Sequence, residues 1–204
     1  MLKQILVLTA FFALASSHSL ASVETQIRKD LRKHQGASFS GLMEAWEKKH
    51  GPKAVPALIK VSQDKKAEDR HRYVSILAAT KMGGKTTWKK WENLLSDRSW
   101  LVRLASLRAL KVLQAQEAGP AILKRLDDPS LVVRMETVSV IESIRPKGAQ
   151  EALLKAAEDP KNYQNKKPLW VPEQALKALE TMTGKKPKSQ TFEARLAEWK
   201  KIIR

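Results

Sequence analysis

Apolar residues recur every three or four positions along most of the chain, which is the spacing of one face of an α-helix. Alternating runs of β-branched residues, which would indicate strands, are nearly absent. Glycine and proline interrupt the helical pattern at short intervals, as at Gly51-Pro52 and Gly119-Pro120. The pattern therefore predicts an all-α chain whose helices lie near residues 23–34, 40–50, 53–63, 69–82, 87–96, 100–115, 118–126, 130–144, 148–158, 172–183 and 191–203.

The helical pattern contains a repeat with a period of 31 residues. The segment 97–103, Asp-Arg-Ser-Trp-Leu-Val-Arg, returns as Asp-Pro-Ser-Leu-Val-Val-Arg at 128–134, and Asp159-Pro160 begins a third copy. The third copy carries an insertion, so that Pro172 stands where the arginine is expected. A period of roughly 20–50 residues is typical of solenoids, in which stacked units form an extended binding face. The repeat therefore favours a binding scaffold over an enzyme with a cleft.

The two clear copies, residues 97–126 and 128–157, resemble the HEAT-like repeat of the phycobilin lyases. Both share an Asp, four intervening residues, Val-Arg, small and aliphatic positions, and a second Ala- and Leu-rich helix followed by Asp-Pro or a related turn. The resemblance implies a short right-handed α-solenoid of HEAT-like helix pairs. It also implies a structural ladder, in which charged side chains join successive repeats and do not bind a ligand. The residues of this ladder are Asp97, Arg103, Asp128 and Arg134.

The N-terminal segment differs from the rest of the chain. Lys3 precedes an apolar run at 5–15, and Ser19-Leu20-Ala21 fits the small-x-small rule for cleavage. The run is well short of the ~20 residues that span a bilayer, although an N-terminal anchor is the alternative. We expect a signal peptide and a periplasmic or secreted bacterial protein. The expected organisation is a signal peptide (1–21), an N-terminal helical cap (22–52), HEAT-like repeats (53–190) and a C-terminal capping helix (191–204).

The charge of the chain is strongly basic, with 38 Lys and Arg against 21 Asp and Glu. Removal of Lys3 with the signal peptide leaves 37 against 21, a net charge of +16. This excess favours an acidic protein or peptide, an anionic envelope polymer or a lipid head group as partner, and export argues against nucleic acid. Because the charges are scattered, an ordinary solvated surface is the alternative. The absence of cysteine excludes disulfides and thiolate sites.

The sequence offers no pattern for catalysis or for a cofactor. His34, His50 and His71 remain after export, and no two of them have the spacing of metal ligands on a helix. His71 stands at a core position, where we expect a satisfied buried histidine. Neither a Ser-His-acid order nor a glycine-rich phosphate loop is present. We therefore expect a non-catalytic protein, and the less favoured alternative is a HEAT-like enzyme of the DNA glycosylase or lyase type.

An apolar stripe lies opposite the predicted core face of the first helix in each repeat. Leu104 and Leu107 point about 200° and 140° away from Val102, where a solvent-facing helix should carry polar residues. The resemblance places this helix on the concave side, so the stripe predicts a groove for a partner. The alternative is a wider core. Together with an aromatic residue in the lysine-rich insertion 161–170, the expected partner-binding residues are Tyr73, Ile76, Leu104, Leu107, Met135, Val138 and Trp170. The alternative for Trp170 is that it folds back with Leu169 and covers the last repeat.

Overall fold

The structure, a computed structural model, describes residues 21–36 and 38–203. The expected signal peptide lies outside the described residues except for Ala21. The chain divides into two compact units, Met1–Thr87 and Trp88–Arg204. Among the described residues, no helix combines the length and apolar character that a membrane crossing requires.

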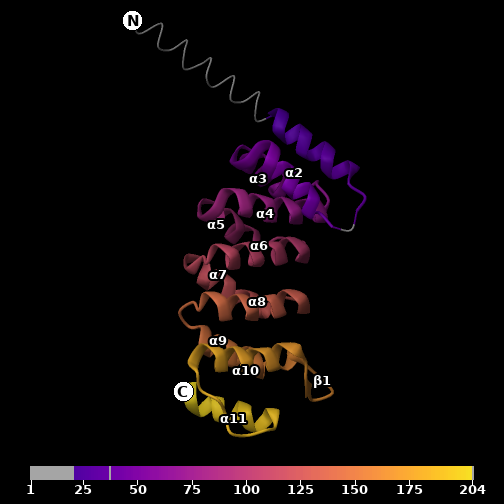
Figure 1. Cartoon of the computed structure of the whole chain (residues 1–204). Helices are drawn as coiled ribbons and strands as arrows, with labels where there is room; N and C mark the ends of the chain where they lie inside the picture. The colour runs from indigo at the N-terminus through magenta and orange to yellow at the C-terminus, as the bar shows by residue number, and fades with distance from the viewer. Residues whose placement is uncertain (1–20, 37, 204) are drawn as a thin grey trace, which may run out of the picture. The chain divides into compact units, whose positions relative to one another are not determined.

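The described residues of the first unit form helices that are joined by short turns (Figure 1). Residues 21–33 form a helix whose Ile27 and Leu31, four residues apart, are buried on one face. Leu58 and Val61 are completely buried on the helix α3, which packs against the longer helix α4. The other bounds follow the predicted pattern closely: α2 (Ser40–His50), η1 (Gly51–Ala54), α3 (Val55–Gln63), α4 (Asp69–Gly83) and η2 (Gly84–Thr87).

The second unit stacks helix pairs, and the first helices of successive pairs, α6, α8 and α10, lie side by side (Figure 1). The final helix, α11, packs against α9 and α10 at the end of the unit (Figure 1). The elements are α5 (Trp88–Leu94), α6 (Trp100–Leu113), η3 (Gln116–Ala118), α7 (Gly119–Leu123), η4 (Lys124–Asp127), α8 (Leu131–Ile144), α9 (Ala149–Glu158), η5 (Pro160–Asn162), β1 (Tyr163–Gln164), β2 (Lys167–Pro168), α10 (Trp170–Thr183) and α11 (Phe192–Ile203).

The predicted core face of these first helices is confirmed. Val102 and Leu110 on α6 are completely buried, and so is Val133, one period later on α8. Small polar residues on the same face satisfy themselves within the helix, because the hydroxyls of Ser106 and Thr137 donate to the backbone carbonyls four residues earlier. Both can therefore be buried between closely packed helices without an unpaired polar atom.

The inserted segment forms a small hairpin where the sequence predicted only a loop. β1 pairs with β2 in antiparallel register, Tyr163 opposite Pro168. The two turn residues, Asn165 and Lys166, have φ values of 51° and 63°, and two positive φ values are what a type I′ turn needs. Asn-Gly is the sequence that usually indicates such a turn, and here Lys166 stands in place of the glycine, so the sequence did not predict the hairpin. The hairpin stands immediately before α10 and contacts it.

Candidate functional site

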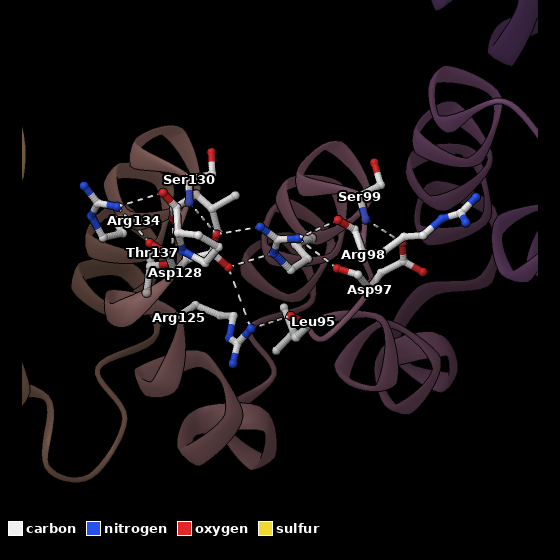
Figure 2. A network of polar contacts seen from close by, with 12 residues as sticks. Leu95, Asp97, Arg98, Ser99, Arg125, Asp128, Ser130, Arg134 and Thr137 are labelled. Atoms are coloured by element: carbon white, nitrogen blue, oxygen red, sulfur yellow. Dashed lines mark hydrogen bonds and ion pairs between the residues drawn. The ribbon is translucent and has the colours of Figure 1, made fainter. Parts of the chain in front are cut away.

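Two buried arginines on the first turns of α6 and α8 join successive repeats. Nε and Nη2 of Arg103 donate to the two carboxylate oxygens of Asp128 at 2.7 and 2.6 Å, and its Nη1 donates to the carbonyl of Asp97 at 2.8 Å. Arg134 repeats this arrangement, because its Nη1 donates to the carbonyl of Asp128 at 2.8 Å (Figure 2). Its Nε donates to Oδ1 of Asn162 at 2.9 Å. Of the predicted ladder residues, Arg103 and Asp128 join successive repeats through charged side chains, whereas Asp97 contributes its backbone carbonyl and Arg134 pairs with Asn162.

Both carboxylate oxygens of Asp128, at the centre of the ladder, are engaged within the protein. The side chain of Asp128 is completely buried and also accepts the amide N–H of Ser130. Asn162 takes the place at which the repeat predicts Asp159, because the turn η5 sets the pairing residue three positions further along the chain. Its amide nitrogen donates to the carbonyl of Ala156, so both ends of the amide are engaged. These polar residues hold the repeats together, and Asn162 is the one that the sequence did not reveal.

The exposure expected of the apolar stripe is wrong for four of its residues. Ile76 and Leu107 are 0% exposed, Val138 2% and Leu104 5%, so they belong to the wider core that was the alternative. Tyr73 and Met135 are half-buried. The four buried side chains therefore offer almost no exposed surface to a partner.

The stripe on α6 and α8 is buried because the two helices lie close together. One turn beyond the apolar stripe, Arg108 Nε donates to Glu136 Oε2 at 3.0 Å and Lys111 Nζ donates to Ser139 Oγ at 2.8 Å. These bonds run from α6 to α8, so polar side chains occupy the outer part of the face and aliphatic ones lie between the helices. Helical periodicity gives the direction of a side chain, and it does not give the distance to the next helix.

Exposed apolar side chains are found instead where these first helices begin. Trp100 and Trp170 are the first residues of α6 and α10 and are 47% and 66% exposed, and Val132, the second residue of α8, is 47% exposed. The contacts from Arg103 to Asp128 and from Arg134 to Asn162 hold the three helix starts beside one another. We call Trp100, Val132 and Trp170 the apolar row. An exposed apolar group of this kind is more informative than a buried one, since it has no role in the core.

A basic hairpin adjoins the apolar row. Lys166 and Lys167 lie in the inserted hairpin, both exposed, and β2 contacts the helix that begins with Trp170. Neither lysine forms an ion pair with any residue that the structure describes. The expectation that the insertion places Trp170 next to lysines on the surface therefore agrees with its 66% exposure. The sequence did not predict Trp100 as a surface residue, because it lies within the segment assigned to the ladder. Its position at the start of a helix was the signal that could have indicated its exposure.

The described residues contain no cluster of three or more His, Asp or Glu that could hold a metal ion. Of the three histidines considered above, His71 is buried on α4, and its position in the core is as expected. Its Nε2, however, has no hydrogen-bond partner among the described residues, which differs from the satisfied histidine that we expected.

Comparison with known proteins identifies the repeat. Residues 88–169 match the family described as HEAT repeats, which confirms the predicted HEAT-like repeats in the second unit. Among solved structures, a chain in the complex of CpcE and CpcF of phycocyanin lyase from Nostoc sp. PCC7120 is similar, with a TM-score of 0.52 and 21% identity. The match covers 74% of the present chain and 62% of that chain, less than two thirds of its length. At this identity the likeness shows the all-α fold alone. No curated protein matches the chain.

Proposed function

From a stack of HEAT repeats with an exposed apolar row, we propose that this chain is an exported, non-catalytic scaffold that binds a protein or peptide partner. The contact surface is the apolar row, in place of the groove first expected from the sequence. The observation that carries the proposal is the exposure of Trp100, Val132 and Trp170 at three adjacent helix starts. Leaving a large apolar side chain in water forgoes about 1.5–3 kcal/mol of burial free energy. Tryptophan is also enriched among the residues that dominate binding energy at protein interfaces.

Other observations support parts of the proposal. The similar solved structure is a complex of two proteins, CpcE and CpcF, which supports a protein as the partner. The lyase activity of that complex is not carried over to this chain, because the likeness extends to the fold alone. The non-catalytic role and export rest on the sequence, namely the missing catalytic motifs and the N-terminal pattern around Lys3 and Ala21.

A second candidate function is binding of an anionic envelope polymer or lipid head group. It is favoured by the net charge of +16 that remains after export and by the exposed Lys166 and Lys167 beside the apolar row. The two candidates differ in their dependence on salt. Attraction between exposed charges is screened within about 8 Å at physiological ionic strength and about 3 Å at 1 M salt, whereas burial of apolar side chains persists.

Capture from an envelope fraction tests the proposal with matched variants. The mature protein is immobilised, and bound proteins are compared after washing at low and at high salt. We expect a discrete protein to stay bound to the wild type at high salt and to be lost from the Trp100→Ser, Trp170→Ser double variant. Val112→Ser is the control, since Val112 is 71% exposed on α6 and lies outside the row.

Each outcome of the capture experiment assigns the surface. Loss from the double tryptophan variant with retention by Val112→Ser supports the apolar row. Equal capture by all three proteins at high salt contradicts it. Binding that disappears at high salt, and that Lys166→Gln with Lys167→Gln also removes, favours the anionic partner instead. Circular dichroism spectra of all variants verify that the fold is retained.

A further inference from the structure

A small pocket in the first unit has no part in the proposed function. It lies between the helix of residues 21–33, the end of α3 and the start of α4, and has a volume of about 200 Å³. Its polar lining consists of Arg28, Arg32, Asp64, Lys66, Glu68 and His71. Pockets for drug-sized ligands measure about 300–1,000 Å³, and a water molecule takes about 30 Å³. The pocket therefore has room for a small ion with a few waters.

A buried side chain with an unused polar atom lines this pocket. His71 is only 6% exposed, and its Nε2 has no hydrogen-bond partner among the described residues. The nearest carboxylate oxygen, Oε2 of Glu68, is 3.8 Å away, which is beyond a hydrogen bond. Burial lowers the pKa of His71, so its imidazole is neutral at pH 7. Since buried polar atoms almost always have a partner, Nε2 is available to a molecule that enters the pocket.

The carboxylates of the pocket are already engaged. Asp64 accepts from Arg28 Nη1 at 2.9 Å and from the Lys66 amide at 2.9 Å. Glu68 accepts from Arg70 Nε at 2.8 Å. These bonds leave the acidic groups little capacity to attract a cation.

The groups that remain available in the pocket are donors. Neither the Arg32 guanidinium nor the Lys66 ammonium has an ion pair within the part of the chain that the structure describes. The pocket also adjoins the beginning of α4, a helix of 15 residues, and helix N-termini favour negative charge. Two cations, a helix start and an unpaired imidazole together match an anion.

We propose that this pocket binds a small oxyanion, phosphate or carboxylate, between the Arg32 guanidinium and Nε2–H of His71. The guanidinium offers two parallel N–H donors, which suit the two oxygens of either anion, and the imidazole supplies a third bond from the buried side. The anion is either a free ion or the terminal group of a larger molecule. The site is independent of the apolar row and of the function proposed for it.

Titration of the histidine ring nitrogens by NMR tests the site. The full mature protein, labelled with ¹⁵N, is titrated at pH 7.5 with sodium phosphate, sodium acetate and glycerol 1-phosphate, each against sodium chloride at equal ionic strength. We expect a saturating shift of His71 Nε2 with a Kd in the millimolar range for at least one oxyanion. Tighter binding of glycerol 1-phosphate than of phosphate identifies an esterified source, and the reverse order identifies the free ion.

Two variants distinguish a specific anion site from the general attraction of anions to a basic protein. Arg32→Gln is expected to weaken binding at least tenfold, whereas Lys29→Gln, an exposed change on the same helix outside the pocket, changes it less than twofold. The proposal is overturned if no oxyanion shifts His71 beyond the effect of chloride, or if Arg32→Gln binds as tightly as the wild type. Both substitutions are at exposed positions, so the comparison does not depend on a variant of the buried histidine.

Discussion

Removal of the Asp128 carboxylate is the sharpest test of how the repeats are held together. Its completely buried side chain accepts two charge-assisted hydrogen bonds from Arg103, at 2.7 and 2.6 Å, and a third from the Ser130 amide at 2.9 Å. Asp128→Ala leaves the Arg103 guanidinium, itself 8% exposed, charged and without its partner. Breaking a buried pair in this way costs about 3–5 kcal/mol. That is a large share of the ~5–15 kcal/mol by which a domain is stable.

Two further variants show whether the loss comes from the orphaned charge. Asp127→Ala alters the neighbouring residue, whose side chain is 83% exposed and pairs with Lys161 at the surface, so we expect a loss within about 1 kcal/mol. Arg103→Met combined with Asp128→Ala removes both charges. The double variant should be more stable than Asp128→Ala alone, since no buried charge is left unpaired.

Urea unfolding followed by circular dichroism at 222 nm measures all of these variants, with equal slopes of the free energy against urea as the condition for comparing them. The reasoning is refuted if Asp128→Ala loses no more stability than Asp127→Ala. The single variant Arg103→Met completes the comparison. The pairing is also refuted if the losses of stability from Arg103→Met and Asp128→Ala add up to that of the double variant, because additivity means that the two side chains do not depend on each other.

Three further predictions concern burial, pH and export. Leu104→Asp places an unpaired carboxylate in the core and should lower the free energy of unfolding by roughly 2–7 kcal/mol, and the thermal midpoint with it, whereas Val112→Asp should change the free energy by less than about 0.5 kcal/mol. Similar melting temperatures for both variants would contradict the burial of Leu104. Burial lowers the pKa of His71 in the folded chain, so the unfolded chain takes up the proton first as the pH decreases. The free energy of unfolding should therefore fall as the pH decreases through about 6.5, and His71→Gln should lessen this fall. Identical melting temperatures from pH 7.5 to 5.5 in both proteins would argue against this effect of His71. Mass spectrometry of the exported protein should find cleavage after Ala21, and an intact Met1 in the cytoplasm would rule out export.

The helices and the ladder were predictable because their signals are local in the sequence. Apolar spacing gives the helix type, and the 31-residue return of Asp and Val-Arg gives the stacking unit. The contact between Arg103 and Asp128 follows from that return, since the second repeat begins with the aspartate that pairs with the arginine of the first repeat. Asn162 escaped prediction because the inserted turn moves the partner of Arg134 three residues beyond the expected Asp159.

The surface was harder to predict than the core. Periodicity showed that Leu104 points away from Val102, but burial also depends on how closely α6 and α8 approach, which no local pattern reports. The same limit applies to Trp100, whose exposure depends on its place at a helix start beside two others. The hairpin that precedes Trp170 has a lysine with positive φ at its turn. Positive φ is uncommon for lysine, so the sequence did not predict this turn.

Photo-cross-linking from the apolar row shows whether this surface contacts a protein partner. A photoreactive phenylalanine derivative replaces Val132 in the mature protein, which is mixed with the envelope fraction at high salt and irradiated. The matched control carries the same derivative in place of Val112, which is also exposed and lies outside the row. The account predicts a discrete cross-linked protein from position 132 that is absent from position 112. No product from position 132, or the same products from both positions, would contradict it.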